Sequence, residues 1–428
     1  MMRVPQRFRR TLLTALPLVL IGGGVVVAAL DGGDGSGGGG HAAANRAQLK
    51  RACGGLLPYE ELKGLVPDEV AGEVAQYGTL LEPGQASRSL VNCAVTWPGH
   101  GSARVRAVPL ISPLPMSVEV EEVAAGGGDE EYEVPGLTGR VGKDTSPWII
   151  AECPGGLDGQ VRAVQDMYVM AEVDLPVPGK GEQARNLTGF RTAVQVANGI
   201  TARQKCGGTP LAVPTRIVDT YEEHTVADPD SVDGETTRVE KPGLGARKCR
   251  GLSKRSIFPG TWVATGDLQD SRLLSVCTAT LMDPDDPTEP VPSPEDGTIA
   301  DVSAASWAGP LSSAAVDQYD ITDRTFDSTE ERRTTAFTDG ADQLELTFWS
   351  RSTCTAGNTY HRVAVYRHES SYGYDEQDTY ERTLTEAERS ELSRDARKLM
   401  DGYLTDPDGW PRQQRCHDTE FLGEVQGW

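Results

Sequence analysis

The chain has 428 residues, which is enough for two to four domains of ordinary size. It carries 41 basic and 63 acidic residues, a formal net charge of −22, and only 6% of its residues are aromatic. Such an acidic surface repels phosphate backbones and anionic lipid headgroups, so we expect no nucleic-acid partner. The charge indicates a solvated surface that resists aggregation.

The first thirty residues predict a single membrane anchor. Residues 1–10 contain four arginines, and an uncharged stretch follows from Thr11 to Leu30. A helix of this length spans a hydrocarbon core of about 30 Å. The positive-inside rule then places residues 1–10 in the cytoplasm and everything beyond Leu30 outside. The alternative is a cleaved signal peptide followed by secretion, because Ala42-Ala43-Ala44 is typical of a cleavage site.

The remaining chain divides into a tether and two units. Residues 31–45 are rich in glycine and predict a flexible tether. No cysteine lies near the end of the apolar stretch, which argues against a lipid-anchored lipoprotein. Residues 228–245 hold Asp, Pro, Gly and Glu and predict a linker between a first unit, 46–227, and a second unit, 246–428.

Eight cysteines follow the anchor, and none belongs to a C-x-x-C pair. In an oxidising compartment we expect all of them to form disulfides. They are Cys53, Cys93, Cys153, Cys206, Cys249, Cys277, Cys354 and Cys416.

The cysteines lie in two matching sets, which predicts an internal repeat. Cys53-Gly-Gly-Leu is echoed by Cys249-Arg-Gly-Leu, and a tryptophan stands five residues before both Cys153 and Cys354. A duplicated unit should close its bridges within itself. Sequential pairing gives the shortest loops, so we expect the pairs Cys53–Cys93, Cys153–Cys206, Cys249–Cys277 and Cys354–Cys416.

The apolar patterns predict an α+β fold, with two tandem copies of an antiparallel sheet that carries helices on one face. Residues 182–202 have helical spacing, and Thr385 with Glu388 forms a capping box before a second helix. A short helix is expected over 58–66. The expected strands are 89–97, 102–111, 147–152, 161–173, 273–281, 343–351 and 360–368.

The start of each unit resembles the small extracytoplasmic sensor-like and lipoprotein-type domains of actinobacteria. The matching residues are Cys53 to Pro58, which read Cys-Gly-Gly-Leu-Leu-Pro, and Cys93 to Trp97. The resemblance covers about the first third of each unit and is fainter in the second, where Leu281 replaces the tryptophan. It implies an envelope location and a fold rather than an activity.

No residue pattern predicts catalysis, a cofactor or a metal site. His361 and His368 flank one predicted strand seven residues apart, so their side chains should point to opposite faces. Acidic runs at 119–131 and 283–297 either bind calcium or are simply solvated loops. An enzyme is therefore not expected.

The function that we expect is a non-catalytic binding or sensor-type module of the bacterial cell envelope. It would bind the membrane through Thr11 to Leu30 and an unknown envelope ligand or partner protein. The alternatives are a hydrolase of envelope polymers and a purely structural protein. Small-molecule sites favour domain interfaces, so a ligand site is expected where the units meet, with Trp148 and Trp349 as its platform. The alternative for both indoles is a place in the core.

Overall fold

The computed structural model describes residues 40–84, 87–111, 130–142, 145–157, 164–176, 181–219, 221–227, 236–242, 248–253, 258–285, 299–312, 315, 343–368 and 385–427. The predicted cytoplasmic tail, the predicted anchor and most of the tether lie outside these residues. No described helix combines the length and the apolar character that a membrane crossing needs.

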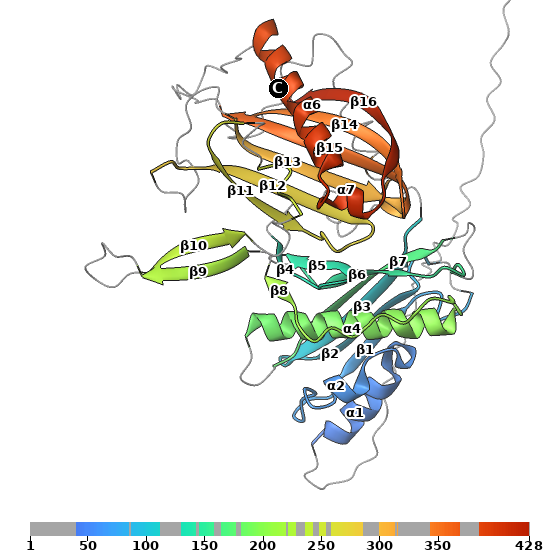
Figure 1. Ribbon diagram of the computed structural model, residues 1–428. Coiled ribbons are helices and arrows are strands. Elements are labelled where there is room, and N and C mark those ends of the chain that lie inside the picture. Colours follow the sequence, from blue (N-terminus) through green and yellow to red (C-terminus); the bar gives the residue numbers. More distant parts are fainter. Residues whose placement is uncertain are drawn as a thin grey trace, which may run out of the picture.

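The first unit is built on an eight-stranded sheet whose neighbouring strands are all antiparallel (Figure 1). The spatial order is β1-β2-β3-β7-β6-β5-β4-β8. The strands are β1 (Glu73–Tyr77), β2 (Val91–Trp97), β3 (Gly101–Pro109), β4 (Glu130–Glu133), β5 (Thr138–Gly142), β6 (Trp148–Glu152), β7 (Asp166–Asp174) and β8 (Val218–Asp219). Its described helices are α1 (Ala42–Arg51), α2 (Tyr59–Leu62) and α4 (Glu182–Arg203), with a 3-10 turn at Ala52–Gly55.

The second unit is built on a six-stranded antiparallel sheet with the order β11-β12-β13-β15-β14-β16. Its strands are β11 (Thr261–Asp267), β12 (Leu274–Met282), β13 (Ile299–Ala308), β14 (Gln343–Cys354), β15 (Gly357–His368) and β16 (His417–Gly427). A 3-10 turn covers Gly309–Leu311, and the described helices are α6 (Glu386–Thr405) and α7 (Trp410–Gln413).

The two sheets follow the same path over five strands. The order β1-β2-β3-β7-β6 in the first sheet corresponds to β11-β12-β13-β15-β14 in the second. A long helix follows the fifth of these strands along the chain in both units, α4 after β7 and α6 after β15. The mixed α+β class with two antiparallel sheets is therefore confirmed, and the shared path agrees with the predicted repeat. The sheets differ beyond β6 and β14, where β5, β4 and β8 stand in one and β16 in the other.

All eight cysteines are bridged, and each bridge lies within one unit. The pairs are those expected, Cys53–Cys93, Cys153–Cys206, Cys249–Cys277 and Cys354–Cys416. The first pair of each unit ties the segment before the first strand to the second strand. The second pair ties the end of β6 or β14 to the chain that follows the long helix.

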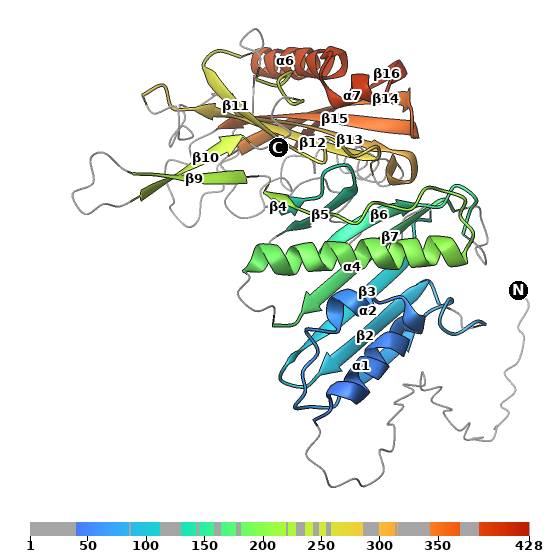
Figure 2. The ribbon, with the colours of Figure 1, turned by 60° about the horizontal axis from the view of Figure 1, so that its bottom comes forward.

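Helix α4 packs against β7 and β6 because its apolar residues recur at helical spacing. Phe190, Val194, Ala197 and Ile200 are all buried on that side. Gly189 permits the close approach, since a Cβ atom there would lie 2.9 Å from the carbonyl oxygen of Ala171 in β7. In the second unit α6 covers β14 and β15 (Figure 2).

Two segments predicted to be irregular are in fact ordered. Residues 42–45 of the predicted tether begin α1, because the sequence from Ala42 is rich in good helix formers. The Asn45 amide also donates to the carbonyls of Pro67 and Val70. Residues of the predicted linker form β10 (Thr236–Pro242), which pairs with β9 (Tyr221–Ala227). The β-branched residues of β10 favour an extended strand. The charged residues and proline of this segment had predicted an irregular linker instead.

The capping box predicted at the start of α6 is present. The Thr385 hydroxyl accepts a hydrogen bond from the Glu388 amide at 3.3 Å, and the Glu388 carboxylate accepts one from the Thr385 amide at 2.8 Å. We expect Thr385→Ala to lower the free energy of unfolding by about 1 kcal/mol, because a backbone N–H of the first turn loses its partner. Urea denaturation followed by circular dichroism measures the change. The matched control Thr385→Ser keeps the hydroxyl and should stay close to the parent; equal losses in both variants would contradict a role for the cap.

Candidate functional site

The two units meet through the sheet faces that the long helices leave uncovered. In β6, Ile149 and Ala151 belong to the apolar cluster under α4, whereas Trp148 and Ile150 belong to a different cluster. The two pairs belong to different clusters because alternate side chains of a strand point to opposite faces of the sheet. The second cluster contains residues of both units and therefore joins them. Its buried members are Val108, Leu110, Trp148, Ile150, Tyr168, Leu268, Leu273, Leu274, Ala305, Trp307, Leu311, Ala315 and Trp349.

Trp148 and Trp349 both lie in this inter-unit cluster, as their matching sequence positions suggested. Trp148 stacks on Tyr168 with ring centroids 5.7 Å apart, and Trp349 stacks on Trp307 at 5.9 Å. The indoles are, however, only 3% and 1% exposed. In this arrangement neither ring presents a face to a ligand, which favours a place in the core. The two indoles are therefore packed in the apolar contact between the two sheets.

Polar side chains around the cluster also cross from one unit to the other. The Thr138 and Ser271 hydroxyls are 2.7 Å apart. The Leu268 amide donates to the Glu133 carboxylate at 2.6 Å, and Arg272 Nε donates to the Glu152 carboxylate at 2.8 Å. Leu268 has a φ of +54°, a left-handed conformation that leucine rarely adopts. The Glu133 carboxylate therefore holds a strained backbone turn of the other unit.

The contact buries carboxyl groups from both units. Burial raises the pKa of Asp267 to about 7; Arg140 opposes this shift and the Glu133 carboxylate adds to it. Burial also raises the pKa of Glu133, against the hydrogen bond from the Leu268 amide. The Arg140 guanidinium is buried as well and lies over the Trp148 ring, 5.8 Å from its centroid.

Asp166 is a third carboxyl with a raised pKa at the same contact. Burial and repulsion from Glu152 raise its pKa to about 6, while Arg272 of the second unit lowers it. Glu152 and Arg272 form an ion pair whose side chains are about half exposed. The contact thus combines an apolar centre with carboxyls whose charge depends on pH near neutrality.

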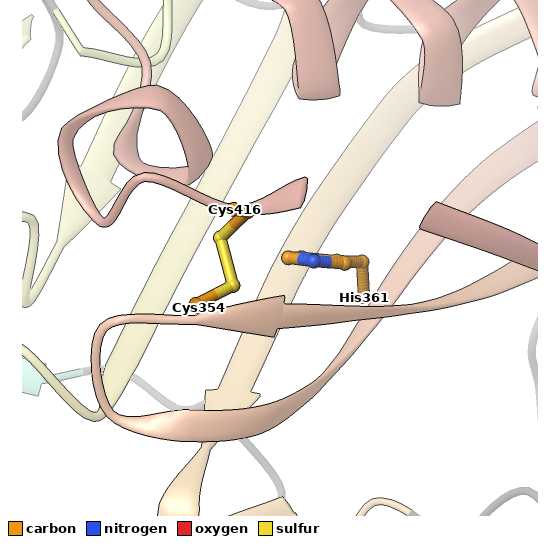
Figure 3. Close-up of side chains that lie close together, drawn as sticks. All are labelled: Cys354, His361 and Cys416. Atoms are coloured by element: carbon orange, nitrogen blue, oxygen red, sulfur yellow. A yellow bond between two sulfur atoms is a disulfide. The ribbon is translucent and has the colours of Figure 1, made fainter. Parts of the chain in front are cut away.

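A separate buried site lies in the second unit, beside the Cys354–Cys416 bridge (Figure 3). The His361 side chain is fully buried, with Nδ1 2.7 Å from the Ser306 hydroxyl and Nε2 3.1 Å from the Ser352 hydroxyl. Burial lowers the pKa of His361 to about 3. The imidazole is therefore neutral under all ordinary conditions.

The hydroxyls around His361 form a chain through the core. Ser306 lies 2.9 Å from the Tyr403 hydroxyl, which lies 3.3 Å from the Ser275 hydroxyl. At the other side Ser352 lies 2.9 Å from the Thr419 hydroxyl. A serine beside a histidine is a pattern of nucleophilic catalysis, but here both groups are closed off from any substrate.

The sequence pattern does not indicate the His361 site. The spacing relates His361 only to His368, whereas the side chains beside it in the structure belong to Ser306, Cys354 and Cys416. One signal was present: His361 has the same strand parity as Val363 and Val365, both of which are buried under α6. A histidine on the inner face of an apolar strand needs polar partners in the core. Most of the two acidic runs considered for calcium lie outside the described residues.

Comparison with protein-family models finds no match to this chain, and comparisons with curated proteins and with solved structures find none either.

Proposed function

We propose that the protein is a membrane-anchored, extracytoplasmic component of the bacterial cell envelope that acts as a non-catalytic binding or sensor-type module. The observation that carries the proposal is the bridging of all eight cysteines in four intra-unit disulfides. Such bridges persist in oxidising compartments outside the cytoplasm. The apolar stretch from Thr11 to Leu30 supplies the anchor in this proposal.

The arrangement of reactive groups supports binding over catalysis. The histidine that lies beside serine hydroxyls, His361, is fully buried and neutral. A general base must reach the proton that it abstracts from a bound substrate, and no path leads from solvent to a side chain with no exposed surface.

The location is tested in intact cells that express the full chain. We expect the protein to sediment with membranes, and a protease added outside the cells to digest everything beyond Leu30. Thiol alkylation without reductant should label none of the cysteines. A soluble protein that resists external protease and is alkylated at several cysteines would overturn the proposal. A cytoplasmic marker enzyme serves as the control for cell integrity.

The activity is tested with the purified extracytoplasmic part and fractionated envelope polymers. Retention of the protein on one fraction, without release of soluble sugars or peptides, supports the binding module. Release of such products would identify a hydrolase of envelope polymers. Retention on no fraction would favour a structural role.

A further inference from the structure

We propose that Cys354, Cys416 and His361 form a binding site for a divalent metal ion of the zinc class once the bridge between the two cysteines is reduced. The inference does not depend on the proposed envelope function. It rests on three ligand groups that the fold gathers from β14, β15 and the segment just before β16 (Figure 3).

The Cys354–Cys416 bridge is the most accessible of the four. The six cysteines of the other bridges are at most 1% exposed, whereas Cys354 is 7% exposed and Cys416 is half-buried. Thiol–disulfide exchange requires a thiolate to reach one of the sulfur atoms. A small dithiol reductant should therefore open this bridge first.

The three groups are close enough to share one ion. Their ligand atoms all lie within 4.8 Å of one another. In a tetrahedral zinc site with Zn–S bonds of about 2.3 Å and Zn–N bonds of about 2.0 Å, the sulfur and nitrogen ligand atoms lie roughly 3.5–3.8 Å apart. After reduction the sulfurs need to separate by only about 2 Å from their bonded distance. Cys416 lies beside β16, an edge strand, where a shift of this size disturbs one strand pairing.

His361 is prepared for this role by its surroundings. The imidazole is fully buried beside the two sulfur atoms, and hydrogen-bond contacts with two serine hydroxyls fix its orientation. Metal-binding histidines usually have their second nitrogen held by a hydrogen bond. Here Nδ1 is held by Ser306, whose hydroxyl is fixed in turn by Tyr403. This leaves Nε2 for the metal, which would replace the 3.1 Å contact of Nε2 with the Ser352 hydroxyl; that hydroxyl keeps its contact with Thr419.

The proposed step needs one external reactant, a dithiol that reduces the bridge. A dithiol gives two electrons and two protons to the bridge, which becomes two thiols, while the dithiol becomes a disulfide. The divalent ion then replaces both thiol protons, and two protons are released to solvent. With two thiolates and one imidazole, the fourth position of a tetrahedral ion is left for water, which can enter from the half-buried side of Cys416.

The test uses the purified full chain, opened with a limited amount of dithiothreitol and titrated with Co²⁺ and Cd²⁺. We expect one ion per chain, thiolate–metal absorption bands and the release of two protons per ion. Differential alkylation with mass spectrometry should show Cys354 and Cys416 as the first free thiols. The oxidised chain should give no such bands.

Variants distinguish this site from unspecific thiol binding. We expect His361→Ala to weaken metal binding about 10- to 100-fold, whereas His417→Ala, which alters an exposed histidine next to Cys416, should have no effect. His361→Ala also leaves a cavity in the core. A double variant, Cys354→Ser with Cys416→Ser, therefore provides a second test. It lacks the disulfide as the reduced protein does, but it has no thiolates and should bind no ion. The proposal is overturned if another bridge opens first, if the reduced and folded chain binds no ion, or if the double variant binds as tightly as the parent.

Discussion

Replacing Trp349 by alanine is expected to lower the free energy of unfolding by about 3–5 kcal/mol, the range for deleting a large aromatic side chain from a packed core. The Trp349 indole is 1% exposed and stacks on Trp307 within the cluster that joins the two units. Its removal leaves a cavity between the sheets. We therefore expect the units to lose part of their mutual stabilisation.

Calorimetry and urea denaturation followed by circular dichroism measure this effect. If the parent unfolds in one cooperative transition, Trp349→Ala should broaden or split it, because each unit has its own core and its own disulfides. Trp262→Ala is the matched control: this tryptophan of β11 is half-buried and lies outside the inter-unit cluster. A smaller loss in Trp349→Ala than in Trp262→Ala would show that the indole is not packed between the units.

The second large effect is a dependence of stability on pH that originates at Asp267. The folded protein holds the pKa of this carboxyl at about 7, above its ordinary value of 3.8. The folded state therefore binds the proton more tightly than the unfolded state does. The contribution of Asp267 to stability should be greatest below about pH 4, should fall as the pH rises towards 7 and should level off above that. Asp166, whose pKa is about 6, contributes in the same direction.

Asp267→Asn removes the charge without changing the shape of the side chain. We expect it to stabilise the protein at pH 8 by about 2–4 kcal/mol relative to the parent, and to have little effect at pH 4, where the parent carboxyl is protonated. Urea denaturation at several pH values measures both. Asp401→Asn is the matched control, because it makes the same change in net charge at an exposed residue of α6. It should leave the dependence of the free energy of unfolding on pH unchanged. A parent whose stability rises between pH 5 and 8 would contradict the burial of Asp267.

The sequence predicts local elements well where a pattern repeats within one element. The α4 helix lies within one residue of its predicted bounds, and the Thr385 capping box and the four sequential bridges are as expected. The sequence does not indicate a strand where the alternation of apolar residues is weak. β13 is built largely of alanine and serine, and β1 is a mostly exposed edge strand without an apolar alternation.

The candidate sites were harder to predict because they depend on which elements meet. The matching positions of Trp148 and Trp349 indicated that the two residues have related roles, but only the packed sheets show that both rings are covered. Nothing around Asp267 in the sequence reveals Arg140 and Glu133, more than 120 residues away. The same holds for His361, whose hydrogen-bond partners come from two other strands, β13 and β14.

The confinement of each bridge to one unit has a consequence for how the protein acquires its disulfides. Eight cysteines can pair in 105 ways, but four can pair in only three. Because synthesis proceeds from the N-terminus, Cys53, Cys93, Cys153 and Cys206 can oxidise before any cysteine of the second unit has emerged. Each unit then has to select one of only three possible pairings, first in the N-terminal unit and then in the C-terminal unit. Mispaired chains with bridges between the units should be rare when the protein is made vectorially and common when it is refolded from the fully reduced chain.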